Sequence, residues 1–313
     1  VMIYSAGDNQ VIAYDAKTGS EIWRFTYALP EGLVPVHPTN RGVALWDDKI
    51  YLATLDAHLI ALDAKTGSKL WDQTLANWEE GYYSTLAPLI VKGKVMSGVS
   101  GGEFGIRGFV QAFDAESGEP AWKTYTIPGP GEPGHDSWPG DTWERGGGPI
   151  WVTGNYDQAN DMVYFTTGNA APWVGSLRPG DNLHTASALG LDPATGAIKT
   201  HFQFHHNDTW DWDETVPPTL IDIDGKQIAY KFARNGWMYK LDRTGGSSAS
   251  STASPTSSRT SSPGSTPRPG GRATIPPMCR CWASGRSSAP PPGAAATGRA
   301  RPTTRTSATS SSR

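Results

Sequence analysis

Cysteine is missing from residues 1–246, because both cysteines of the chain, Cys279 and Cys281, lie further along. This part of the chain therefore holds no disulfide, and the sequence leaves the redox compartment undetermined. No run of about 18 apolar residues occurs, which excludes a membrane-spanning helix. No signal peptide is visible either. The opening residues, VMIYSAGDNQ, start inside a strand pattern, so we expect the natural N-terminus to lie upstream.

Residues 247–313 lack acidic residues, lysine and most large apolar types, and consist mainly of Ser, Thr, Pro, Gly, Ala and Arg. They carry nine arginines, so the acidic excess of the chain lies in residues 1–246. Such a composition buries too little apolar surface to offset the entropy of ordering. We interpret 247–313 as a disordered tail and a frameshift product of a GC-rich gene, since it begins abruptly after YKLDRTGG. A basic linker or a nucleic-acid-binding arm stays open as an alternative.

One phrase recurs along the first part of the chain. It ends a strand of alternating apolar residues at an aspartate, turns through Lys-Thr-Gly or a similar sequence, and starts a second strand. The steps between successive aspartates are 48, 51, 78 and 50 residues, and the aspartates are Asp15, Asp63, Asp114, Asp192 and Asp242. Periods of roughly 40–50 residues with turns between strands indicate the blades of a β-propeller.

Tryptophan follows three of these turns at a fixed offset, at Trp23, Trp71 and Trp122. An indole in that position can dock onto the neighbouring blade. The long third step contains PGPGEPGHDSWPGDTWERGGG (128–148), an insertion between blades. Insertions on one face of a repeat array often bind ligands.

The repeat resembles the tryptophan-docking motif of the quinoprotein propellers, the eight-bladed dehydrogenases that use pyrroloquinoline quinone (PQQ). The resemblance covers residues 1–246 and about five of the eight blades. It implies an all-β fold for 1–246, a partial propeller followed by the tail at 247–313. Non-catalytic propellers with the same repeat exist, including a scaffold for outer-membrane protein assembly, so the fold alone leaves the function open.

Three segments outside the repeats resemble the site of the quinoprotein alcohol dehydrogenases. In SGGEFGIRGFV (100–110), the match implies that Ser100, Gly101 and Gly102 approach the quinone plane and that Glu103 binds the metal. In TTGNAAPW (166–173), Asn169 matches the metal-binding asparagine, whose amide oxygen suits a hard cation. Each segment alone is also compatible with a glycine-rich turn.

The third segment is NDTWDWDE (207–214). The match implies that Asp211 is the catalytic base beside the quinone and a metal ligand. Asp213 stands where the lanthanide-dependent dehydrogenases carry an additional aspartate. A trivalent ion favours one more anionic ligand than calcium does, so Asp213 favours a lanthanide over Ca²⁺. A solvated acidic loop is the alternative, and we interpret Asp208 and Glu214 as solvated or structural neighbours.

Further cofactor contacts follow from the same resemblance. It assigns an arginine on a cofactor carboxylate, a threonine, a tryptophan stacked under the quinone and an arginine near the reactive carbonyl, here Arg41, Thr85, Trp151 and Arg234. Guanidinium groups suit a polyanionic quinone because they bind carboxylates bidentately.

Two positions depart from the family pattern. Pro35-Val36 stands where many members carry a vicinal disulfide, and Pro149 replaces a hydroxyl residue.

The implied reaction is the oxidation of a primary or secondary alcohol to an aldehyde or ketone. The metal polarises the quinone carbonyl, Asp211 takes the hydroxyl proton, hydride passes to the quinone and Arg234 stabilises the developing charge. The resemblance implies PQQ, a lanthanide ion or Ca²⁺, a small alcohol, a periplasmic location and a cytochrome c acceptor. We expect no nucleic-acid partner, and a homodimer and peripheral membrane association stay open.

Two hypotheses compete. The chain is part of a quinoprotein alcohol dehydrogenase, or it is a non-catalytic propeller scaffold for protein assembly in the periplasm. A scaffold does not need Glu103, Asn169, Asp211 and Asp213 together, and these residues favour the enzyme. With about five blades of eight, we expect the chain by itself to be weakly active or inactive.

Overall fold

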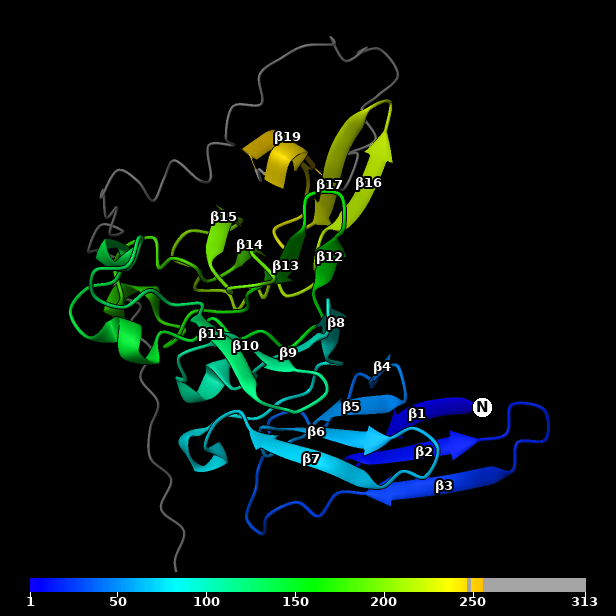
Figure 1. Ribbon diagram of the computed structural model, residues 1–313. Helices are drawn as coiled ribbons and strands as arrows, with labels where there is room; N and C mark the ends of the chain where they lie inside the picture. The colour runs from blue at the N-terminus through cyan, green and yellow to red at the C-terminus, as the bar shows by residue number, and fades with distance from the viewer. Residues whose placement is uncertain (247–248, 256–313) are drawn as a thin grey trace, which may run out of the picture. The chain divides into compact units, whose positions relative to one another are not determined.

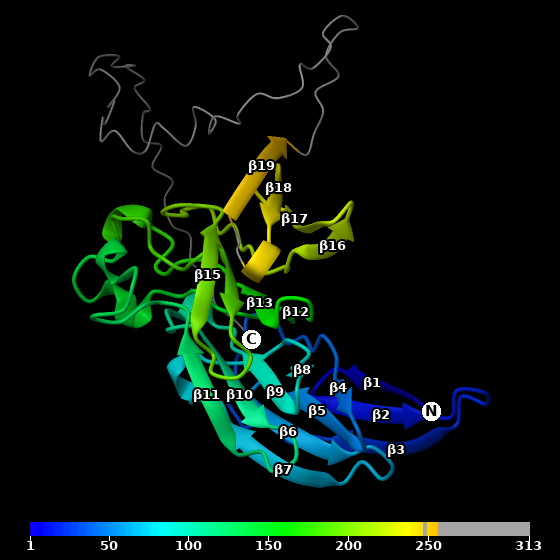
Figure 2. The same cartoon turned by 45° about the horizontal axis from the view of Figure 1, so that its top comes forward.

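The computed structural model describes residues 1–246 and 249–255, all within the first of the chain's two compact units, Val1–Gly271. These residues form five antiparallel sheets that follow one another in chain order (Figures 1 and 2). Within each sheet the hydrogen-bonded neighbours are also consecutive in sequence. The all-β prediction and the five predicted blades are confirmed.

The first sheet has three strands, β1 (Met2–Ala6), β2 (Gln10–Tyr14) and β3 (Glu21–Thr26). The second contains β4 (Ala44–Trp46), β5 (Lys49–Ala53), β6 (His58–Asp63) and β7 (Lys69–Thr74). The third contains β8 (Leu89–Val91), β9 (Lys94–Gly98), β10 (Phe109–Asp114) and β11 (Pro120–Tyr125). The fourth contains β12 (Asn155–Asp157), β13 (Met162–Thr166), β14 (Ser187–Leu191) and β15 (Ile198–Gln203). The fifth contains β16 (Thr219–Ile223), β17 (Lys226–Phe232), β18 (Trp237–Asp242) and β19 (Ala249–Pro255).

Short 3₁₀ helices occur in the connections. They are η1 (Trp78–Glu80), η2 (Gly102–Phe104), η3 (His135–Ser137), η4 (Thr142–Arg145), η5 (Gly175–Leu177) and η6 (Thr244–Gly246). The predicted insertion at 128–148 follows β11 and contains η3 and η4. In the described part of the chain, no helix is long and apolar enough to cross a membrane.

The predicted tail lies outside the described residues except for Ala249–Pro255, whose backbone pairs with β18. The domain boundary at residue 246 stays a prediction.

The recurring aspartate shapes the turn that joins the last two strands of a sheet. Asp15 Oδ1 accepts hydrogen bonds from the backbone N–H groups of Lys17 (2.9 Å) and Thr18 (2.8 Å). Asp63 makes the same pair of bonds one sheet later. The backbone N–H of Thr18 is the main cause that holds the pKa of Asp15 below its ordinary value, and the hydroxyl of Thr66, followed by its N–H, does the same for Asp63. The glycine that ends the turn, Gly19, has φ +72°, which glycine adopts without steric cost.

Each of the three predicted tryptophans docks on the turn of the next sheet. Trp23 Nε1 donates to the carbonyl of Ala64 (3.2 Å), and its ring covers Gly67, where a Cβ atom would lie 2.6 Å from Cε3. Trp71 bonds Ala115 in the same way, and Trp122 bonds Pro193. The glycine in the turn therefore serves two purposes, the positive φ and the space for the indole.

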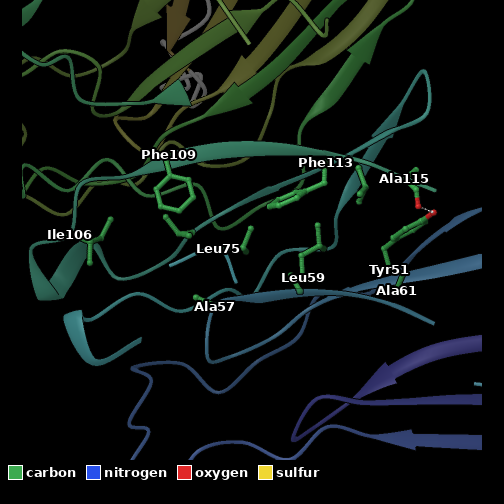
Figure 3. Close-up of a cluster of buried hydrophobic side chains, with 12 residues drawn as sticks. Tyr51, Ala57, Leu59, Ala61, Leu75, Ile106, Phe109, Phe113 and Ala115 are labelled. Atoms are coloured by element: carbon green, nitrogen blue, oxygen red, sulfur yellow. Dashed lines mark hydrogen bonds between the residues drawn. The ribbon is translucent and has the colours of Figure 1, made fainter. Parts of the chain in front are cut away.

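Apolar side chains fill the space between neighbouring sheets. Figure 3 shows one such cluster, in which Tyr51 and Leu59 of the second sheet face Phe109 and Phe113 of the third. Tyr51 Oη donates to the carbonyl of Ala115 at 2.9 Å, so the buried hydroxyl is satisfied. Complete burial of each such side chain contributes about 1.5–3 kcal/mol. The packed sheets form a rigid support for the connections that carry the polar residues described next.

Candidate cofactor and metal site

The acidic segment NDTWDWDE lies in the connection between β15 and β16. Asp208 is 4% exposed, and its carboxylate accepts the backbone N–H groups of Trp210 (2.9 Å) and Trp212 (2.8 Å). These bonds form a tight local turn, in which an aspartate side chain commonly accepts backbone N–H groups two residues on. Asp211 lies within this turn and adopts φ +58°.

Glu214 closes the same segment on its other side and is completely buried. Its Oε1 atom lies 2.6 Å from His205 Nε2 and accepts the backbone N–H of Arg234 at 2.8 Å. Its Oε2 atom lies 2.9 Å from Lys231 Nζ. The interpretation of Asp208 and Glu214 as solvated is wrong, because both carboxylates are buried and have donors around them. Their structural role is the correct alternative.

Asn169 lies between β13 and β14 and meets the acidic segment directly. Its backbone N–H donates to Asp213 Oδ1 at 2.9 Å. Several buried polar atoms of the described residues have no hydrogen-bond partner, and Asn169 Oδ1 and Asp211 Oδ1 are two of them; the others belong to Asn9, Tyr164, His184, Gln203 and Glu214. Buried oxygen atoms rarely stay unsatisfied, so the two oxygens near Asp213 can accept a ligand.

Two glycines let the backbone pack closely against oxygens of the site. A Cβ atom on Gly102 would lie 2.5 Å from Asn169 Oδ1, and one on Gly168 would meet Asp213 Oδ1. The ring of Pro149 packs against both glycines. Pro149, which departs from the family pattern, therefore forms part of the wall of the site.

Burial is the main cause that raises the pKa of Asp213 to about 7. The carboxylates of Asp211 and Glu103 contribute to this rise, whereas the N–H of Asn169 and the guanidinium of Arg234 oppose it. Burial also raises the pKa of Asp211, with Glu103 and Asp208 adding to the effect and Arg234 opposing it. Arg234 Nη1 lies 3.9 Å from Asp213 Oδ2. The crowded acids thus repel one another in a place that favours a bound cation.

A second group of predicted residues surrounds Arg41. Its guanidinium donates to Thr85 Oγ1 at 2.5 Å and lies 4.6 Å from the centre of the Trp151 ring. Thr85 Oγ1 lies 3.1 Å from Ser100 Oγ. The structure therefore brings together a cation, two hydroxyls and an indole, and a guanidinium group in such a setting suits an anion.

Tyr83 is close enough to both groups for their charges to act on it, and the sequence interpretation missed it. It forms an isolated backbone bridge with Ser100, and its side chain is 4% exposed. Burial raises its pKa, Glu103 and Asp213 raise it further, and Arg41 lowers it, so all three charges act on the phenol. Tyr83 and Phe104 also line an open cavity with Pro35, at the place where the vicinal disulfide is replaced. The sequence could have indicated Tyr83, because it lies two residues before the predicted cofactor contact Thr85.

Among the residues that the structure describes, no three His, Cys, Asp or Glu side chains converge closely enough to hold a metal ion. The oxygens that do converge include the amide of Asn169, and Glu103 is exposed on η2 beside Gly102. The structure therefore brings Asn169 and Asp213 into direct contact, and Asp211 and Glu103 lie close enough for their charges to act on Asp213. The donors are all hard oxygens, which fits Ca²⁺ or a lanthanide ion, and the two unpartnered oxygens fit such an ion.

Residues 1–269 match the family model described as "PQQ: Glucose/ethanol/alcohol dehydrogenase, beta-propeller domain". The chain belongs to this PQQ dehydrogenase family. Quinoprotein alcohol dehydrogenase PedH of Pseudomonas putida is 41% identical over 269 residues, which cover 79% of this chain and 45% of PedH. Quinohemoprotein alcohol dehydrogenase ADH IIB of Pseudomonas putida is 41% identical over 272 residues, covering 80% of this chain and 39% of the relative.

A solved structure of a europium-containing methanol dehydrogenase superposes on 80% of this chain with a TM-score of 0.75 and 34% identity. The match covers 48% of that protein. This PQQ dehydrogenase chain therefore spans less than half the length of the curated relatives it matches.

Proposed function

We propose that this chain is part of a PQQ-dependent alcohol dehydrogenase that oxidises a primary or secondary alcohol to an aldehyde or ketone. The observation that carries the proposal is the pair of buried, unpartnered oxygens, Asn169 Oδ1 and Asp211 Oδ1, beside the Asp213 carboxylate. The names of the relatives support the substrate class. When bound, PQQ and its metal ion supply the electron acceptor and the Lewis acid of the reaction.

The residues of this chain have separable tasks in that proposal. Asp211 takes the proton of the substrate hydroxyl, and burial, which raises the pKa of its carboxyl, makes it a better base. Arg234 supplies positive charge on the same side of the site as Asp213. Arg41, Thr85, Ser100 and Trp151 hold the planar cofactor. Gly101 and Gly102 continue this wall from Ser100, and their lack of a side chain lets them pack against Gly81 and Asn169.

The metal is proposed to be a lanthanide ion in preference to Ca²⁺, held by Asn169, Asp211, Asp213 and Glu103. Asp213 supports this choice, because it adds a second carboxylate beside that of Asp211. The europium-containing structure is consistent with it.

We further propose a periplasmic location and electron transfer to a cytochrome c, which the quinohemoprotein relatives support. A homodimer and peripheral membrane attachment are not part of the proposal. The alternative function, a non-catalytic scaffold, gives no reason for Asn169, Asp211 and Asp213 to lie together.

Binding of Tb³⁺ to this chain tests the metal site, because Trp210 and Trp212 flank Asp211 and can sensitise lanthanide luminescence. We expect luminescence that La³⁺ displaces at least tenfold more effectively than Ca²⁺. Asp211→Asn should weaken binding at least tenfold, since it removes an anionic ligand.

Asp47→Asn is the matched control, because Asp47 is exposed in the β4–β5 turn and also adopts a positive φ. If Asp211→Asn and Asp47→Asn bind Tb³⁺ equally, the acidic surface binds the ion and the proposed site is wrong.

A further inference from the structure

A completely buried arginine lies beside the site. Arg178 is 0% exposed, and its guanidinium donates to the carbonyl oxygens of Pro172 (2.7 Å), Trp173 (3.4 Å) and Asp208 and to Asn182 Oδ1 (2.6 Å). Burial of a guanidinium is costly unless its donors are satisfied. Here the acceptors are three main-chain carbonyls and an amide, so the side chain binds backbone on two different connections.

Two asparagines complete this arrangement. Asn207 Nδ2 lies within bonding distance of the Arg178 carbonyl (2.9 Å) and of Asn182 Oδ1 (2.9 Å). Asn182 Nδ2 also donates to the Arg178 carbonyl, at 3.0 Å. We call Arg178, Asn182 and Asn207 the polar knot. Each of the two connections donates to the other, because Arg178 donates to the carbonyl of Asp208 and Asn207 donates to the carbonyl of Arg178.

The polar knot joins the two connections that carry the proposed metal ligands. Pro172 and Trp173 follow Asn169 by three and four residues, and Asp208 precedes Asp211 by three. Both connections run outside the strands, with only the single turn of η5 between β13 and β14. Nearer the site, the connections meet again where the N–H of Asn169 donates to Asp213 Oδ1.

We infer that the polar knot positions the Asn169 connection against the Asp211–Asp213 segment and thereby fixes the spacing of the metal ligands. The inference rests on the proposed function for its metal, but the spacing itself belongs to the chain. A site assembled from two irregular connections needs support from behind the ligands, since loose ligands lose affinity. Arg178 is a positioning residue, because it touches neither the ligand oxygens nor the space between them.

Hydrogen–deuterium exchange at the Asn169 amide tests the inference without any metal. In Arg178→Lys, a single ammonium replaces a planar fork with acceptors on both connections. We expect the Asn169 amide to exchange at least tenfold faster. We also expect the Tb³⁺ dissociation constant to rise at least fivefold.

Arg243→Lys is the matched control, since Arg243 is 3% exposed and joins two sheets through Asp157 and Asp222, neither of which is a proposed ligand. It should lower stability without changing either readout at the site. Asn207→Gly is the second variant should Arg178→Lys fail to fold. It removes the amide donors and keeps the positive φ of this position accessible, and it should also speed exchange.

Unchanged exchange at Asn169 in a folded Arg178→Lys or Asn207→Gly chain would overturn the inference, whatever the metal does. Equal acceleration in Arg243→Lys would also overturn it, because the effect would then be general destabilisation. Failure of the parent chain to bind Tb³⁺ at Asp211 would count against the proposed function, and the exchange result would still decide the role of the polar knot.

Discussion

The environment of Asp213 disfavours the ionised form of its carboxyl group. Its side chain is only 10% exposed, and the negative charges of Asp211 and Glu103 lie near it. The Asn169 N–H and Arg234 offset part of the cost. In the absence of a cation, the chain is therefore destabilised by the group that would bind one, a cost that active sites commonly carry.

The sign of this effect sets a pH dependence. An unfolded aspartate has a pKa near 3.9, and burial raises the folded pKa of Asp213 to about 7. Below about pH 4 the carboxyl is protonated in both states and costs nothing. As pH rises from about 4 to 7, the folded state loses up to roughly 4 kcal/mol from this group.

Asp213→Asn removes this cost and keeps an oxygen for the Asn169 N–H. We expect the metal-free variant to be more stable than the parent at about pH 8, by up to about 4 kcal/mol, and equal to it near pH 4. Urea denaturation of both chains across that range measures the difference. A gain that is the same at both ends of the range would show that Asp213 is not the titrating group.

At the scale of the elements, two turns with the same sequence allow the effect of backbone strain to be measured separately from the effect of packing. Gly19 and Gly67 both occupy the sequence DAKTGS, with φ +72° and +73°. A Cβ atom on Gly19 would have no neighbour within 4 Å, whereas one on Gly67 would lie 2.6 Å from Trp23 Cε3. The two positions therefore require the same positive φ, and they differ because an indole packs against Gly67 and not against Gly19.

We expect Gly19→Ala to lower the free energy of unfolding by about 1–2 kcal/mol through its positive φ. Gly67→Ala should cost about 1–3 kcal/mol more, because the methyl group displaces Trp23. Urea denaturation with tryptophan fluorescence measures both variants. Equal losses in the two would show that indole docking contributes nothing to the turn.

The sequence predicts these elements well because their causes are local. The aspartate, the turn and the glycine lie within five residues of one another, and the indole follows at a fixed distance. Arg178 was not predicted, because it binds main-chain carbonyls, which carry no residue type to recognise. The burial of Glu214 was missed for a related reason, since its partners His205, Lys231 and Arg234 are brought to it only by folding.

At the scale of the whole molecule, the chain contains the proposed metal ligands but spans less than half the length of the curated relatives it matches. The proposed cofactor contacts in this chain are Arg41, Thr85, Ser100 and Trp151. Ligand pockets normally bury about 70–90% of a small ligand. We therefore expect the binding of the quinone to depend more than the binding of the metal on the parts of the relatives that this chain does not cover.

We expect the chain to bind Tb³⁺ yet to bind PQQ weakly and to turn over ethanol slowly or not at all. Titration with PQQ, followed by dye reduction with ethanol after loading with La³⁺ or Ca²⁺, measures both properties, with PedH as the positive control. Turnover within tenfold of that control would contradict the expectation and show that the site is complete in this chain.

The tryptophan docking described above also has a consequence for the order in which the sheets fold. Every sheet is built from consecutive strands, so its contacts form within a short length of chain, and low contact order favours rapid folding. Trp23 finds its acceptor only when the turn with Ala64 has formed, and Trp71 only when the turn with Ala115 has formed. Each of the first three sheets is thus completed by the sheet that follows it in the chain, and assembly is expected to proceed from one sheet to the next.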